Sequence, residues 1–437
     1  MTDQHSFDGE ALVRAAKAGD TDAMYRLASI LGAEGHKDHA VNWLKKAAAN
    51  GHGDARFTLA NFYLKGVNVD RNVSHAIDML EVGVKAWHMP SVHIYASLLA
   101  QGAGVERNFD QALSLMIMAA QKGHSPALVE LAFMLLMVRH DHELIHPLMQ
   151  AAACRQNLHA GLYIAESLSA DSELIDARIA GFWAARAQEM GHPRAEEIAD
   201  LAKEGPAPSA DWVDVPEIKA DKLLKELKAL ALWTVKEFDV LLDRPRVKKI
   251  TGAIPTAVCD YVMALSMPLM QEAREFAPES GEWVAHSQCR GHLATFWQED
   301  HNLVSFLVAD RMAKAAGAAH DFAEQFNVLA FPRGGEYLPR VDFIAPEAPN
   351  AAEAIARAGQ SVATVHLTLH CAKSGGHTCF GPLAETADVS KGDIVVLRNI
   401  LDDGEVDDQA MSAETMVAEG EHWVATRLIR EKSQPFS

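Results

Sequence analysis

The chain has 437 residues, 49% of them hydrophobic, and a formal net charge of −19. This length exceeds one ordinary hydrophobic core, so two or three domains are expected. The acidic charge argues against nucleic acid or an anionic membrane surface as a partner, because both would be repelled. The sequence shows neither a leader-like segment nor an apolar run long enough to cross a bilayer, which predicts a cytoplasmic protein.

The cysteines are few, odd in number and without C-x-x-C spacing: Cys154, Cys259, Cys289, Cys371 and Cys379. This usage is typical of a reducing compartment and gives no indication of a zinc ribbon. Most of the five are expected to be small buried hydrophobic residues.

The first half of the chain repeats itself with a period of 36 residues. The segments "AAANGHGDA", "GVKAWHMPS" and "AAQKGHSPA" place His52, His88 and His124 at the same offset in successive units. An alanine is expected to open a helical stretch in each unit, namely Ala40, Ala76 and Ala112. Such a fixed period indicates a repeat architecture.

Each unit contains two short helices. In "DARFTLANFYLKG" the apolar residues fall on one helical face, and the helix is predicted to end at Gly66, while the preceding "AVNWLKKAAANG" is predicted to end at Gly51. Two such helices cannot bury their apolar faces alone. Neighbouring units must therefore stack into an α-solenoid.

The order of these parts, with "YLKGVNVDRN" and "AQGAGVERN" between units, resembles the Sel-like repeat family, which is related to tetratricopeptide repeats. The resemblance covers residues 11–205, and beyond residue 133 only the helical pattern persists. It implies a scaffold that presents a concave surface to a protein or peptide partner. The repeated histidines are interpreted as capping or packing residues at the turns between helices, since the 36-residue period gives them no shared metal geometry.

Residues 203–219 contain three prolines and no helical period, which predicts a linker. A helix that joins the two halves is predicted over residues 220–242. The predicted domains are an α-solenoid over residues 1–205, a linker with its connecting helix over 206–244, and a third segment over 245–437.

In the third segment, "QSVATVHLTLHC" and "KGDIVVLRNIL" are rich in β-branched residues and predict strands. Helices are predicted around residues 256–275 and 303–319. Helices followed by a run of strands favour an α+β domain built on a double-sheet β-barrel of the jelly-roll type.

Residues 245–431 resemble the prolyl 4-hydroxylase branch of the iron and 2-oxoglutarate dioxygenases. The stretches "FNVLAFPRGGEYLPRVDFI", "GQSVATVHLTLH", "GGHTCFGPL" and "VAEGEHWVATRLIRE" follow the family's order. The resemblance implies a double-stranded β-helix. It also implies a site at which two histidines and one carboxylate hold Fe(II) beside 2-oxoglutarate.

The residues at those positions depart from the family's pattern. The family's iron-ligand positions fall on Arg340, Asp342 and Ser412, so that only the carboxylate is kept. The family's co-substrate lysine falls on His422, and a tyrosine that often assists it falls on Phe331. Neither iron nor 2-oxoglutarate is therefore expected as a cofactor, and Asp342 would be the one family ligand left for any metal.

Arg340 cannot replace a histidine ligand, because its guanidinium stays protonated and has no lone pair to offer. Its simplest use is an ion pair with Asp342, which is two residues along the same strand face. Contact between these two side chains would favour an inactive site. Two histidines within about 5 Å of Asp342 would favour a rebuilt one.

Two other uses of the barrel stay open. A relocated metal site would draw on His366, His370, His377 or His292, although the first two are roughly 13 Å apart along a strand. Alternatively, Arg340, His422 and Arg427 would form a cationic pocket for a carboxylate or phosphate ligand. Neutralisation of a buried aspartate by Arg340 explains the same substitution without any ligand.

The sequence therefore predicts a solenoid joined to a pseudo-oxygenase that acts as a peptide- or ligand-binding module. The alternative is an active 2-oxoglutarate-dependent protein or peptide hydroxylase, with Fe(II) held in a non-standard site. A pure scaffold, whose barrel mouth is filled by side chains, is the third hypothesis.

Overall fold

The computed structural model describes residues 9–167, 174–189, 207–235, 237–277, 282–345, 351–382 and 384–434. The chain divides into two compact units. The first comprises Met1–Ala127 with Glu217–Ala220, and the second comprises Leu128–Pro216 with Asp221–Ser437. Among the described residues, no helix is both long and apolar enough to cross a bilayer.

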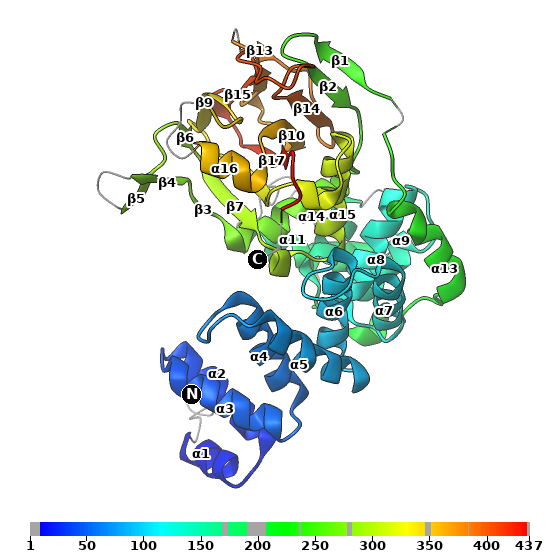
Figure 1. The fold of residues 1–437 in the computed structure, drawn as a ribbon. Helices are drawn as coiled ribbons and strands as arrows, with labels where there is room; N and C mark the ends of the chain where they lie inside the picture. The colour runs from blue at the N-terminus through cyan, green and yellow to red at the C-terminus, as the bar shows by residue number, and fades with distance from the viewer. Residues whose placement is uncertain are drawn as a thin grey trace. The chain divides into compact units, whose positions relative to one another are not determined.

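The first unit is an array of short helices connected by tight turns, coloured blue to cyan in Figure 1. Its helices are α1 (Gly9–Lys17), α2 (Thr21–Ala33), α3 (Lys37–Ala49), α4 (Gly53–Lys65), α5 (Val73–Lys85), α6 (Met89–Gln101) and α7 (Phe109–Gln121). The first residues of α3, α5 and α7 are 36 positions apart, which confirms the predicted period. Each of these helices begins three residues before the alanine that was expected to open it.

The repeated histidines lie at the turns between helices, as interpreted from the sequence. His52 is the N-cap of α4, and its ring accepts a hydrogen bond from the backbone N–H of Ala55. His88 occupies the same place before α6, where its Nε2 lies 3.0 Å from a carboxylate oxygen of Asp54 in the preceding repeat. Burial lowers the pKa of His124 to about 3, so this third histidine packs as a neutral ring.

The predicted helix end at Gly66 is also confirmed. This glycine has φ +65°, a left-handed conformation that only glycine adopts readily, and its N–H closes the helix on Phe62. The array therefore follows the two-helix unit that the apolar pattern predicted.

The second unit contains both helices and strands. Its helical part is formed by α8 (Ser125–Val138), of which all but the first three residues belong here, α9 (Ile145–Ala153), α10 (Leu158–Glu166) and α11 (Leu174–Glu189). Phe133 of α8 stacks on Tyr261 at a centroid distance of 4.5 Å, and Glu130 accepts a hydrogen bond from the backbone N–H of Leu303. Helix α8 thus contacts residues of the C-terminal half of the chain within one compact unit, while the predicted domain boundaries stay a prediction.

The prediction of one helix over residues 220–242 is correct for about the first third of this range and wrong for the rest. Helix α13 covers Ala220–Leu227, a short 3-10 turn follows at Lys228–Leu230, and Asp239–Leu242 forms strand β1. Strand β1 pairs with β2 (Val247–Ile250), and this pairing overrides the local helical pattern. The helix predicted to reach residue 275 likewise ends early, because α14 covers Thr256–Ser266 and strand β3 begins at Gln271.

Two antiparallel sheets form the strand domain (Figure 1). The larger has the order β1-β2-β14-β10-β17-β8-β7-β3, and the smaller has the order β13-β12-β15-β9-β6. The bounds of the strands not yet given are β3 (Gln271–Glu272), β6 (Cys289–Arg290), β7 (His292–Phe296), β8 (Phe326–Phe331), β9 (Glu336–Val341), β10 (Ser361–His370), β12 (Thr378–Phe380), β13 (Glu385–Thr386), β14 (Ile394–Arg398), β15 (Met411–Glu414) and β17 (His422–Arg430). Short pairs β4 (Arg274–Ala277) with β5 (Glu282–Ala285) and β11 (Ser374–Gly375) with β16 (Val417–Glu419) complete the strands.

Helices α14 and α15 (Leu303–Ala315) pack on β10 in the middle of the larger sheet, whereas α16 (Ala351–Ala358) precedes that strand. Side chains of the two sheets meet between them: His366 of β10 and His422 of β17 face Glu414 of β15. The predicted double-stranded β-helix is therefore confirmed, and its interior is the place where the candidate site lies.

Candidate functional site in the barrel

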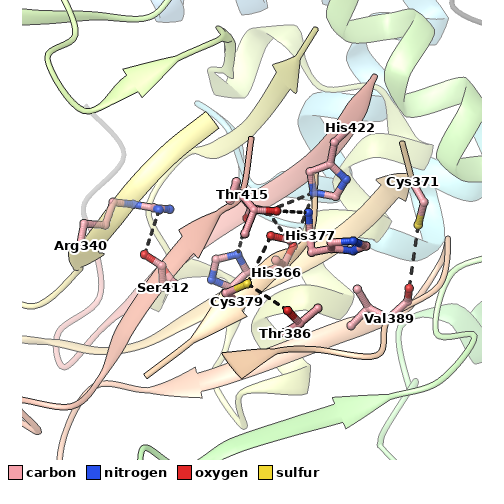
Figure 2. A network of polar contacts seen from close by, with 12 residues as sticks. Arg340, His366, Cys371, His377, Cys379, Thr386, Val389, Ser412, Thr415 and His422 are labelled. Carbon is pink, nitrogen blue, oxygen red and sulfur yellow. Dashed lines mark hydrogen bonds and ion pairs between the residues drawn. The ribbon is translucent and has the colours of Figure 1, made fainter. Parts of the chain in front are cut away.

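The three positions that correspond to iron ligands come together in the structure. Arg340 lies on β9 directly opposite Ser412 on β15, and Asp342 follows β9 on the same face as Arg340. The Arg340 Nε atom lies 3.5 Å from Asp342 Oδ1, and Arg340 Nη1 donates a hydrogen bond to the backbone carbonyl of Ser412 at 3.4 Å. Figure 2 shows this link between Arg340 and Ser412. The guanidinium of Arg340 thus contacts both of the other two positions.

Arg340 is also held from its other side. Its guanidinium carbon lies 3.6 Å from the centre of the Tyr337 ring, a close cation–π contact. Asp342 also accepts a hydrogen bond, from the Thr364 hydroxyl at 3.0 Å. Because both side chains of the ion pair are largely buried, the pair is shielded from competing water.

These residues do not fit Fe(II). The donor set is one carboxylate already paired with a permanent cation and one serine, whereas Fe(II) in this class of site needs two imidazoles and a carboxylate. No group of three or more His, Cys, Asp or Glu side chains could hold a metal ion within the described ranges.

The two co-substrate positions are neighbours as well. Phe331 on β8 lies opposite His422 on β17, and their rings are stacked at an interplanar angle of 19°. Both side chains are buried. Phe331 has no hydroxyl to offer a ligand, so His422 is the polar group of the pair.

His422 is bound to a residue that the sequence analysis missed. Glu414 on β15 is 2% exposed, and its Oε2 accepts hydrogen bonds from His422 Nε2 at 3.0 Å and from the Thr378 hydroxyl at 2.8 Å. Burial alone would raise the pKa of Glu414, but the hydrogen bonds and charge of His422 outweigh it and lower the pKa below its ordinary value. Glu414 is therefore a buried carboxylate anion.

Several polar atoms beside this carboxylate have no hydrogen-bond partner within the described part of the chain. They are both ring nitrogens of His366, Ser412 Oγ, Glu414 Oε1 and His422 Nδ1. His366 Nδ1 lies 4.0 Å from Glu414 Oε1, too far for a direct hydrogen bond. Burial lowers the pKa of His366, which keeps its ring neutral.

Acid should destabilise the barrel through His366. The unfolded chain takes up a proton on this histidine below about pH 6.5, whereas the buried ring resists protonation, so stability falls as pH falls below that value. Below that value we expect the wild type to lose up to about 1.4 kcal/mol more per pH unit than His366→Leu. Chemical denaturation at several pH values measures the difference, and parallel profiles for the two proteins would contradict the prediction.

The other histidines proposed for a relocated metal site do not gather with His366. His292 and His377 are exposed, and His370 lies at the end of β10. Arg427, proposed for a cationic pocket, is buried against backbone carbonyls of Ala309, Ala323 and Glu324. The structure therefore assembles neither the relocated histidine set nor the three-residue cationic pocket.

A signal for Glu414 was present in the sequence. Residues two apart on a strand share a face, so the position of Ser412 also orients Glu414 into the barrel. Thr378 lies directly opposite Glu414 in the pairing of β12 with β15, a register that no local pattern revealed. Thr378 and His422 also line a pocket of about 330 Å³ bordered by the segments 371–377 and 386–389.

The repeat array matches a known family model. The Sel1 repeat model matches residues 21–52, 53–82 and 93–124. A solved Sel1 repeat protein from Oxalobacter formigenes is 25% identical, with a TM-score of 0.26, and the match covers 28% of this chain and 93% of that protein. The N-terminal region of the chain thus carries Sel1 repeats.

The strand domain matches curated prolyl 4-hydroxylases. Prolyl 4-hydroxylase subunit alpha-1 of Rattus norvegicus is 26% identical over 194 residues, which is 44% of this chain and 36% of that protein. Prolyl 4-hydroxylase 13 of Arabidopsis thaliana is 25% identical over 212 residues, covering 45% of this chain and 75% of the relative. The chain spans little more than a third of the length of the first of these.

Among solved structures, the viral collagen prolyl hydroxylase of Paramecium Bursaria Chlorella virus-1 is 17% identical with a TM-score of 0.33. The match covers 42% of this chain and 94% of the viral protein. The family model and the curated relatives together show that the chain combines Sel1 repeats with a prolyl 4-hydroxylase-like domain.

Proposed function

We propose that this protein is a pseudo-oxygenase, in which a Sel1-repeat solenoid holds a protein or peptide partner. Its prolyl hydroxylase-like barrel serves as a peptide- or ligand-binding module without iron chemistry. The observation that carries this proposal is the position of the Arg340 guanidinium, which contacts both Asp342 and Ser412.

This position matters because a metal ion and the guanidinium would compete for the same carboxylate. Arg340 stays protonated, so a dication beside Asp342 would be placed next to a fixed positive charge in a buried site. Releasing Asp342 would also leave the largely buried Arg340 without its carboxylate. Both effects oppose iron binding.

The charge and cysteines of the chain suggest the kind of partner and compartment. A net charge of −19 favours a basic or neutral partner over an acidic one. All five cysteines are free, as expected for a protein of the reducing cytoplasm. The partner is proposed to bind the repeat array, in keeping with the scaffold role that the repeats imply.

The proposal is tested by anaerobic Fe(II) binding to the full chain, with and without 2-oxoglutarate, beside the variant Asp342→Ala. We expect the wild type and the variant to retain the same low level of iron after gel filtration. We also expect no succinate to form from 2-oxoglutarate, because the residues that would hold the metal are already paired with each other.

Stoichiometric iron that is lost in Asp342→Ala would overturn this proposal. It would mean that Arg340 moves aside and that other residues complete a non-standard metal site. The active hydroxylase hypothesis, with Fe(II) and 2-oxoglutarate as cofactors, would then be the correct one.

A further inference from the structure

Glu414 occupies an unusual place for a carboxylate. It lies between the two sheets and is 2% exposed, yet the hydrogen bond from His422 holds its pKa below the ordinary value. A buried anion is stable only where hydrogen bonds and an opposite charge compensate its lost hydration. Here the Thr378 hydroxyl and the His422 ring supply that compensation from two different strands.

The same two groups are the contacts that a bound carboxylate ligand would use. His422 stands where the family resemblance puts the residue that pairs with the far carboxylate of 2-oxoglutarate, and Thr378 lies 3.5 Å from its Nε2 atom. In this chain both donors converge on Glu414 Oε2. The carboxylate of the protein's own side chain thus takes up both donors.

We propose that Glu414 is a built-in occupant of a carboxylate-binding subsite. Its side chain excludes dicarboxylates such as 2-oxoglutarate, and its removal opens the subsite to them. This inference rests on the proposed function, since it explains how the barrel is kept free of co-substrate as well as of metal.

The surroundings of Glu414 contain the polar groups that a carboxylate ligand needs. Only the volume and the negative charge of the Glu414 side chain stand in its way. Buried atoms of His366, Ser412 and His422 have no hydrogen-bond partner in the described part of the chain, so donors and acceptors for a ligand are already present. A pocket of about 330 Å³ lined by Thr378 and His422 adjoins these two donors.

Charge favours the same conclusion. With Glu414 removed, Asp342 remains nearby but is already paired with Arg340. The donors His422 and Thr378 would then lack their acceptor, and an incoming carboxylate would restore two charge-assisted or neutral hydrogen bonds. The wild-type interior repels such a ligand because it already contains the Glu414 anion.

The test is binding of succinate and of 2-oxoglutarate to the full chain in EDTA, measured by calorimetry and by thermal shift. We expect Glu414→Ala to bind both probes at least about tenfold more tightly than the wild type, a difference of about 1.4 kcal/mol. Its midpoint of thermal unfolding should rise with succinate. Glu414→Gln is the matched control, because its amide fills the same space without the charge, and it should bind both probes more weakly than Glu414→Ala.

Adding Thr378→Val to Glu414→Ala should remove most of the gain, since a donor of the subsite is then lost. If Glu414→Ala does not fold, Glu414→Ser takes its place, because its hydroxyl can still contact Thr378. Dicarboxylate binding to the metal-free wild type as tight as to the folded small-residue variant would overturn the inference. Absence of binding to that variant would overturn it as well.

The carboxylate test and the iron test can fail separately. All samples are free of metal and the readout is binding, so a failed carboxylate test leaves the iron experiment unaffected. Conversely, iron binding by the wild type through Asp342 would refute the pseudo-oxygenase proposal whatever Glu414→Ala binds.

Discussion

The double substitution Arg340→His with Ser412→His should give the barrel a metal site. Arg340 and Ser412 are directly opposite each other on paired strands, so the Cβ atoms of two histidines there would be about 5 Å apart. Asp342 shares the face of Arg340 and would supply the carboxylate. We expect the affinity for Co(II) or Fe(II) to rise at least about 100-fold over the wild type, or about 2.7 kcal/mol.

Each single substitution provides a control for this experiment. Arg340→His alone frees Asp342 and supplies one imidazole, while Ser412→His alone leaves the guanidinium in place. The first should bind Co(II) weakly and the second no better than the wild type. Anaerobic titration followed by visible absorption of Co(II) separates these proteins. A double variant that is folded but binds Co(II) no better than the wild type would show that the strands do not hold the ligand geometry.

This expectation depends on parts of the site that could be predicted from the sequence. The spacing of Arg340 and Asp342 is two residues, which on a strand places both side chains on one face, and their ion pair follows from that alone. The predictions of the repeat period and of the helix end at Gly66 also depended only on residues close together in the sequence. Features that depend on residues within one strand or one repeat can therefore be predicted from the sequence alone.

Contacts between residues of different strands could not be predicted in this way. The bond between Glu414 and His422 joins β15 of the smaller sheet to β17 of the larger one, and their proximity depends on how the two sheets face each other. The error over residues 220–242 has a similar origin. Asp239–Leu242 has a helical apolar pattern, but its pairing with Val247–Ile250 makes it a strand.

Arg427 shows how a simple parity rule could have corrected the cationic-pocket hypothesis. It follows His422 by five positions, an odd number, so the two side chains point to opposite faces of β17. His422 faces the barrel interior, whereas Arg427 faces the backbone of α15 and of the turn that follows it. Arg427 is thus a structural residue.

Replacing Arg427 should cause the largest loss of stability among the residues discussed. The side chain is 4% exposed and donates hydrogen bonds to the carbonyls of Glu324 and Ala309 at 2.9 Å and of Ala323 at 3.3 Å. Burial lowers the pKa of Arg427 to about 10, so the group is still charged at neutral pH.

Arg427→Met keeps the aliphatic length and removes all of these donors. Three carbonyls then lose their partner in a buried region, and we expect the free energy of unfolding to fall by about 3 kcal/mol. Arg427→Lys should lose slightly less, because one ammonium cannot reproduce the planar fork of donors.

Arg398→Ala is the matched control, since Arg398 lies on the neighbouring part of the same sheet but pairs with the exposed Asp402. Its effect should stay within about 0.5 kcal/mol, as is usual for a surface ion pair. Denaturant unfolding of the three variants measures the ranking. If Arg427→Met were as stable as Arg398→Ala, the carbonyl contacts would contribute little, and Arg427 would again be available as a ligand-binding cation.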